Sequence, residues 1–136
     1  MTETNDDLWR RLLADGRVRW MPGMLALCPQ WPSLRLCWEV LPHLWSGISG
    51  EVVGHDYAHD IRGAGVPDWT DPATVGCLLA MAREATGCHS LYCRESSQGG
   101  WVARARERAC GSAGAWRGQT EVAALLAAID AAPRKS

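Results

Sequence analysis

The sequence has 136 residues, which is enough for one domain that buries a core without disulfides or a structural metal. Its 14 basic and 15 acidic residues give a formal net charge of −1, which argues against a protein that binds duplex nucleic acid through many phosphates. No apolar run is long enough to span a bilayer, so we expect no membrane partner. The first residues are too acidic and polar for a signal peptide, so we expect a cytoplasmic protein with reduced cysteines.

Two features of the composition bear on binding. Thirteen of the 14 basic residues are arginine, whose planar guanidinium makes bidentate contacts with carboxylate and phosphate. The chain also has eight tryptophans and no phenylalanine, and an indole carries an N–H that needs a partner when it is buried. We therefore expect some of the tryptophans to lie outside the core.

The first part of the chain predicts one helix followed by extended segments. The helix covers residues 5–15, with Asn5 or Asp6 as its cap and Gly16 as its stop. The segments predicted after it are strands over residues 20–28 and 34–40, a breaker-rich loop over residues 29–33, and a hairpin within residues 41–65 that turns near Gly54.

The central element is a helix that starts after Asp71. The Asp71 carboxylate can accept hydrogen bonds from the free amides of the first turn, and Pro72 takes the first helical position, where its missing N–H costs nothing. Gly87 can adopt the left-handed conformation that ends such a helix. The apolar residues expected on one face of this helix are Val75, Leu78, Leu79 and Ala82.

A second hairpin and a last helix complete the chain. The hairpin has strands over residues 89–95 and 101–110, joined by a loop over residues 96–100. The helix covers residues 120–131, has its apolar stripe at Val122, Leu125, Leu126 and Ile129, and ends before Pro133. These elements predict an α+β fold in which a small antiparallel sheet packs against three helices, in a single domain over residues 1–136.

The second hairpin carries the sharpest candidate site. If Glu95 pairs with Trp101, alternate residues of the two strands project from the same face. That face carries Tyr92, Arg94, Arg104 and Arg106. Same-face residues lie about 7 Å apart, so the guanidiniums can reach one ligand that bears two phosphates. The alternative is that these arginines form a solvated outer face.

Two histidines form a second candidate site. His55 and His59 share a face in either a strand or a helix, and nearby carboxylates would allow zinc binding or acid–base chemistry. Zinc usually needs three or four ligands, and no C-x-x-C pair accompanies these histidines. The alternative is a polar loop with local hydrogen bonds, and we expect neither a metal nor a cofactor.

Tryptophans in loops form the third feature. Trp45 lies close to glycine in the sequence, where an indole can form one wall of a pocket for a flat ligand or part of a subunit interface. Trp101 is a further candidate for stacking on a base. Packing in the core is the alternative for most of the tryptophans.

Four stretches of the second half resemble small accessory proteins encoded by phages and prophages. They are DPATVGCLL at residues 71–79, AREA at 82–85, GWV at 100–102 and TEVAALLAA at 120–128. The resemblance brings no established catalytic residues to any position of this chain. It implies a setting in which small cytoplasmic proteins sequester host defence nucleotides or block defence proteins.

Together these features predict a homo-oligomeric protein that is not an enzyme and sequesters a small anionic ligand. The ligand that they favour is a nucleotide immune signal. One alternative is an inhibitor that binds a host defence protein through exposed Trp and Arg side chains. A nucleotide phosphodiesterase that uses the two histidines is the third. The ligand-binding residues predicted are Arg94, Arg104, Arg106, Tyr92, Trp101, His55, His59 and Trp45.

Overall fold

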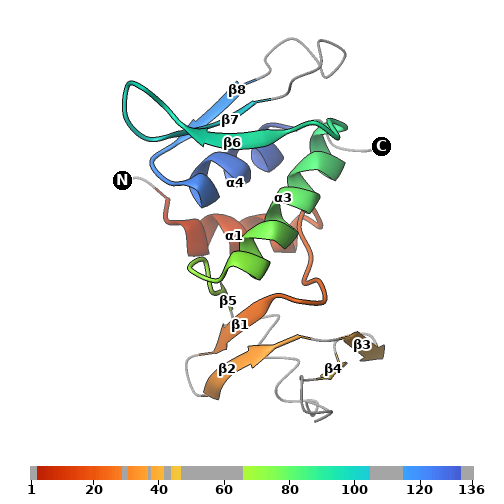
Figure 1. Cartoon of the computed structure of the whole chain (residues 1–136). Helices are drawn as coiled ribbons and strands as arrows, with labels where there is room; N and C mark the ends of the chain where they lie inside the picture. Colours follow the sequence, from red (N-terminus) through yellow and green to blue (C-terminus); the bar gives the residue numbers. More distant parts are fainter. Residues whose placement is uncertain are drawn as a thin grey trace. The chain divides into compact units, whose positions relative to one another are not determined.

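The computed structural model confirms an α+β fold with antiparallel strands (Figure 1). It describes residues 3–28, 31–36, 38–41, 44–46, 66–104 and 115–132, and only the backbone of residues 28, 31–34, 38–41 and 44–46. The helices are α1 (Asn5–Ala14), α3 (Pro72–Thr86) and α4 (Glu121–Ala131). The strands are β1 (Leu25–Cys28), β2 (Trp31–Arg35), β3 (Trp38–Leu41), β4 (Leu44–Ser46), β5 (Val66–Pro67), β6 (Tyr92–Glu95), β7 (Trp101–Arg104) and β8 (Ala115–Gly118).

The chain divides into two compact units. One unit comprises Met1–Val18 and Leu78–Ser136, and the other comprises Arg19–Cys77. The first holds the β6-β7-β8 sheet with α1 and α4, and α4 lies between the sheet and α1 (Figure 1). The second holds the β2-β1-β5 sheet and the β3-β4 pair. The single domain expected over residues 1–136 stays a prediction.

Helix α4 forms the centre of the first unit. Thr120 caps it, because its Oγ1 accepts a hydrogen bond from the amide of Ala123 at 3.1 Å. The predicted apolar stripe is confirmed, since all four of its side chains are buried. Ala124 and Ala128 are fully buried as well, so α4 is covered on more than one side, as its place between a sheet and a helix requires.

The cap of helix α1 lies one residue before the predicted positions. The cap is Thr4, whose Oγ1 accepts from the amide of Asp7 at 3.1 Å, so the prediction of Asn5 or Asp6 is wrong. A threonine hydroxyl serves as well as a carboxylate at this position, and the acids then fall in the first turn, where the helix dipole favours them. Gly16 follows the helix with φ +73°, which confirms the predicted stop.

Two arginines connect α1 and the turn after it to the end of α4. The Arg17 guanidinium donates to the carbonyl oxygens of Ile129 at 3.1 Å, Asp130 at 2.6 Å and Ala132 at 2.9 Å. Carbonyls at a helix C-terminus have no partner within the helix, so these bonds replace the missing ones. Arg11 donates to both carboxylate oxygens of Asp130, at 3.0 and 3.1 Å.

The strands of the second unit differ from those predicted. Strand β1 starts later than residue 20, and the strand predicted over residues 34–40 is divided between β2 and β3. Strand β2 begins within the predicted loop and contains Pro32. Because β2 is at the edge of its sheet, a proline there need not remove a ladder hydrogen bond. The hairpin predicted to turn near Gly54 lies outside the described residues.

The predicted bounds of the central helix are confirmed. Helix α3 starts at Pro72, and Gly87 follows it with φ +72°. The buried face is rotated from the predicted one, because Val75 and Leu79 are only half-buried. The residues buried on α3 are Thr74, Leu78, Met81 and Ala82. Thr74 is polar, but its hydroxyl has hydrogen-bond partners and can therefore be buried.

Asp71 is the hub of a polar cluster at the start of α3. Its Oδ2 accepts from the amide of Thr74 at 3.0 Å and from the Thr74 hydroxyl at 2.7 Å, which confirms the predicted cap. Arg35 of β2 donates to both carboxylate oxygens of Asp71, at 2.5 and 2.9 Å. The Thr74 hydroxyl in turn accepts from the amide of Leu25 in β1 at 2.9 Å. One carboxylate therefore links the helix start with two strands of the second unit.

A methyl group at Gly118 is expected to destabilise the fold. A Cβ there would lie 2.5 Å from the amide nitrogen of Ala124 and 2.6 Å from the carbonyl carbon of Ala123, both in the backbone of α4. Because a helix backbone cannot move away cheaply, we expect Gly118→Ala to lower the free energy of unfolding by about 2–3 kcal/mol. Denaturant unfolding measures this change.

Gly76 provides the matched control. It lies within α3, and a Cβ there would meet nothing within 4 Å. Gly76→Ala should raise the free energy of unfolding by about 0.5–1 kcal/mol, because alanine loses less backbone entropy in a helix. Equal effects of the two substitutions would contradict the packing of β8 on α4.

The helices are short in comparison with a bilayer. None of those in the described parts of the chain is long and apolar enough to cross a membrane.

Candidate functional site

The sheet of the first unit places three arginines on one face. Glu95 pairs with Trp101, as predicted, and Arg94 therefore lies opposite Val102. Strand β8 adds Arg117 on the other side of Val102. Arg104 is two residues beyond Val102 on β7, so it projects from the same face. The three guanidiniums thus surround one central apolar residue.

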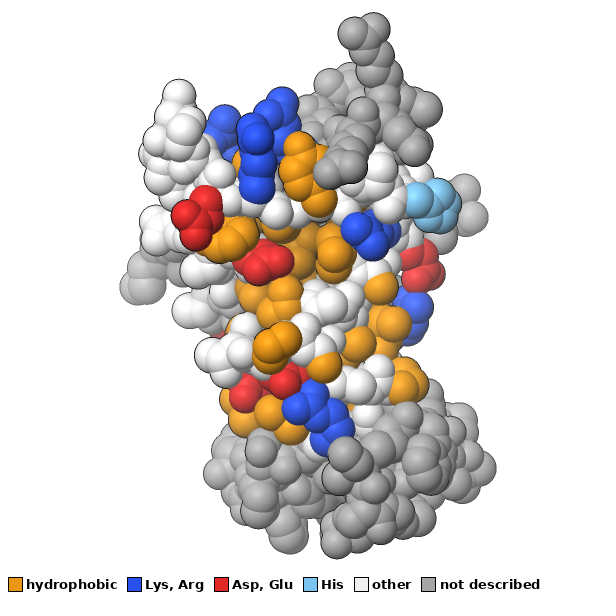
Figure 2. All heavy atoms as spheres, in the orientation of Figure 1, with side chains coloured by type: hydrophobic (Ala, Val, Ile, Leu, Met, Phe, Trp, Pro, Cys, Tyr) orange, Lys and Arg blue, Asp and Glu red, His pale blue; other side chains and the backbone are white. Residues whose placement is uncertain are grey.

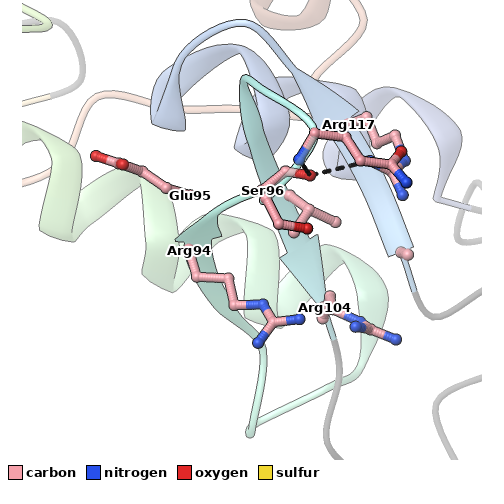
Figure 3. Close-up of a pocket in the computed structure, with 9 residues that line it drawn as sticks. Arg94, Glu95, Ser96, Arg104 and Arg117 are labelled. Atoms are coloured by element: carbon pink, nitrogen blue, oxygen red, sulfur yellow. Dashed lines mark hydrogen bonds between the residues drawn. The ribbon is translucent and has the colours of Figure 1, made fainter.

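These arginines border a hollow of about 460 Å³. Figure 3 shows the Arg94 and Arg104 side chains extending to the same side of the sheet. Val102 is only 5% exposed although it lies on this outer face, as expected if the aliphatic stems of neighbouring arginines cover it. The remaining lining comes from the hairpin loop and β8, namely Glu95, Ser96, Ser97, Gln98 and Ala115.

The described residues that line the hollow carry more positive than negative charge. Within the described part of the chain, no carboxylate forms an ion pair with Arg94, Arg104 or Arg117. Glu95 is the one acidic residue among the described residues that line the hollow, and its carboxylate points away from the arginines in Figure 3. Figure 2 shows arginine side chains next to one another over this sheet. An anion entering the hollow would therefore not displace a described carboxylate.

The hairpin loop holds Ser96 beside Arg117. Its amide donates to the carbonyl of Gly100 at 2.8 Å, and its carbonyl accepts from the amide of Gly99 at 3.1 Å. Gly99 and Gly100 have φ of +93° and +74°, in the left-handed region that glycine adopts without strain. The Arg117 Nη1 then lies 3.4 Å from Ser96 Oγ (Figure 3). This bond is long, so the guanidinium can still turn towards a stronger acceptor.

The predicted site residues are only partly brought together. Tyr92 pairs with Arg104 and shares its face, but it does not line the hollow. Trp101 alternates with Val102 and therefore projects from the opposite face, and it does not line this hollow. Residues that lie outside the described parts are Arg106, His55 and His59, and of Trp45 only the backbone, in β4, is described.

Strand β8 was not predicted from the sequence, and Arg117 was therefore not among the predicted site residues. The segment Ala115–Gly118 is four residues long and its alternation is weak, so no strand was predicted there. The alternation of apolar Trp116 with charged Arg117 was the available sign of a strand. It matches the structure, in which Trp116 is half-buried and Arg117 is exposed.

The thiols of Cys77 and Cys93 are not activated. Burial raises the pKa of Cys93 to about 11, with a smaller contribution from the nearby Glu121 carboxylate. Burial also raises the pKa of Cys77. Both thiols are therefore protonated at neutral pH, and neither is a ready nucleophile. No group of three or more His, Cys, Asp or Glu side chains in the described residues is arranged to hold a metal ion.

Comparison of the chain with protein-family models, with curated proteins and with solved structures finds no match. The geometry of the described residues is therefore the support for the candidate site.

Proposed function

We propose that this protein binds a small ligand carrying phosphate groups through Arg94, Arg104 and Arg117, and holds it without chemical change. The observation that carries the proposal is the convergence of three exposed guanidiniums on one hollow without a carboxylate partner in the described residues. Each guanidinium has a planar set of donors that matches two phosphate oxygens. Like charges held together repel, and a bound anion relieves that repulsion.

The rest of the lining suits the same ligand. Ser96 and Ser97 provide hydroxyls, and Gln98 provides an amide, all of which can donate to phosphate oxygens. Three guanidiniums offer more positive charge than one phosphate needs, so a ligand with two phosphate groups matches them better.

A nucleotide is the form of this ligand that we propose. The resemblance of the second half to phage and prophage accessory proteins supports a setting in which the protein sequesters a nucleotide immune signal and so counters host defence. Sequestration requires tight binding and no turnover. An enzyme would release a product, whereas a sequestering protein keeps the intact nucleotide bound.

Recovery of the ligand separates binding from catalysis. The purified protein is incubated with cyclic di- and trinucleotides, separated from free ligand and heat-denatured, and the supernatant is analysed by mass spectrometry. We expect one of these nucleotides to be retained and recovered intact. Recovery of a cleaved product would overturn the proposal in favour of a phosphodiesterase.

A further inference from the structure

A second hollow lies at the end of the same sheet. It has a volume of about 480 Å³ and is lined by Gly99, Gly100, Trp101, Arg117, Gly118 and Gln119. These residues belong to the hairpin loop, the start of β7 and the end of β8. The half-buried indole of Trp101 is the largest side chain among them.

Two glycines of this hollow are held in close backbone packing. Gly100 has φ +74°, and a Cβ on it would lie 2.8 Å from the carbonyl oxygen of Gly118. Gly118 is opposite Trp101 in the register of β7 and β8, and its backbone packs against Ala123 and Ala124 of α4. Neither glycine contributes a side chain to the hollow, so Trp101 is the one aromatic residue among the described residues that line it.

Arg117 connects the two hollows. It lines both of them, and its guanidinium leans towards Ser96 in the hairpin loop, at the end of the sheet where Trp101 lies. A ligand that reaches from one hollow to the other must pass this guanidinium. One end of such a ligand would be anionic and the other end flat.

We propose that the hollow beside Trp101 is the base-binding half of the ligand site, and that the ligand class is a nucleoside phosphate with at least two phosphate groups. The base stacks on the Trp101 indole, while the phosphates reach Arg117, Arg94 and Arg104. This inference rests on the proposed function and adds to it the subsite that distinguishes a nucleotide from other phosphates. Stacking uses the π-face that all bases have, so this subsite alone selects no particular base.

Calorimetric titration of ADP and of inorganic pyrophosphate into the full chain and its variants tests this assignment. We expect Trp101→Leu to weaken ADP binding about 5- to 100-fold and to leave pyrophosphate binding unchanged. Trp101→Phe keeps an aromatic ring and should restore most of the ADP affinity. Trp116→Leu removes an indole from the same sheet that lines neither hollow, so it should affect neither probe.

The possible failures are distinguishable. Unchanged ADP binding by Trp101→Leu would overturn the base subsite and leave the phosphate site standing. Weaker binding of both probes that Trp101→Phe does not restore would also overturn it, because Trp101 would then have a structural role. Binding of neither probe by the unsubstituted protein would contradict the proposed function itself.

Discussion

Reversing the charge of both Arg104 and Arg117 is expected to lower the affinity for inorganic pyrophosphate by at least about 100-fold. Each guanidinium would contribute charge-assisted hydrogen bonds worth about 1.5–3 kcal/mol, so the loss of two of them alone accounts for this factor. The introduced carboxylates would add repulsion to the loss. Calorimetric titration at low salt measures the effect, because added salt screens the attraction between guanidinium and phosphate.

Arg10→Glu is the control for the single reversal Arg117→Glu, because it makes the same change in net charge on α1. The Arg10 side chain is 44% exposed and pairs with Asp7 at 3.5 Å, so its loss should cost little stability. We expect Arg10→Glu to leave pyrophosphate affinity within about twofold of the unsubstituted protein. Equal losses for Arg10→Glu and Arg117→Glu would mean that net charge, and no particular site, attracts the anion.

Removal of the Asp71 carboxylate should have the largest effect on stability. Asp71→Ala removes a helix cap, and it removes one acceptor from Arg35, which keeps its bond to the Gly23 carbonyl, and one from the buried Thr74 hydroxyl. The Asp71 side chain is 11% exposed and that of Arg35 is 31% exposed, so the pair is neither fully buried nor freely solvated. We expect the free energy of unfolding to fall by about 2–4 kcal/mol. Denaturant unfolding tests this value, and Asp7→Ala, at a surface pair, should cost less than about 1 kcal/mol.

The contribution of Asp71 to the free energy of unfolding also depends on pH. The Arg35 guanidinium, with further hydrogen bonds from Thr74, holds the pKa of the Asp71 carboxyl well below its ordinary value of 3.8. A group whose pKa is lowered by folding stabilises the fold fully above its unfolded pKa and loses that effect as the pH falls through the folded pKa. The stability difference between the unsubstituted protein and Asp71→Asn should therefore be constant above about pH 5 and shrink below about pH 4. A difference that grows on acidification would contradict the ion pair.

Features encoded by neighbouring residues could be predicted from the sequence. The Asp71 cap, Pro72 and Gly87 fixed the bounds of α3, because each acts on the backbone within one turn. The apolar stripe of α4 and the register of Glu95 with Trp101 were predictable for the same reason, since period and loop length are local quantities.

Features that depend on distant residues could not be predicted. The burial of Thr74 follows from hydrogen bonds to Asp71 and Leu25, and Leu25 is 49 residues away. Strand β8 is four residues long and is defined by its pairing with β7. Without β8, the third arginine of the hollow was sought at Arg106, while Arg117 is the one that the structure describes there.

A crystal structure of the protein with inorganic pyrophosphate would test the central claim most directly. We expect pyrophosphate oxygens about 2.7–2.9 Å from guanidinium nitrogens of Arg94, Arg104 and Arg117, in the hollow above Val102. The account would be contradicted if pyrophosphate bound elsewhere, or if carboxylates of the protein occupied these three guanidiniums.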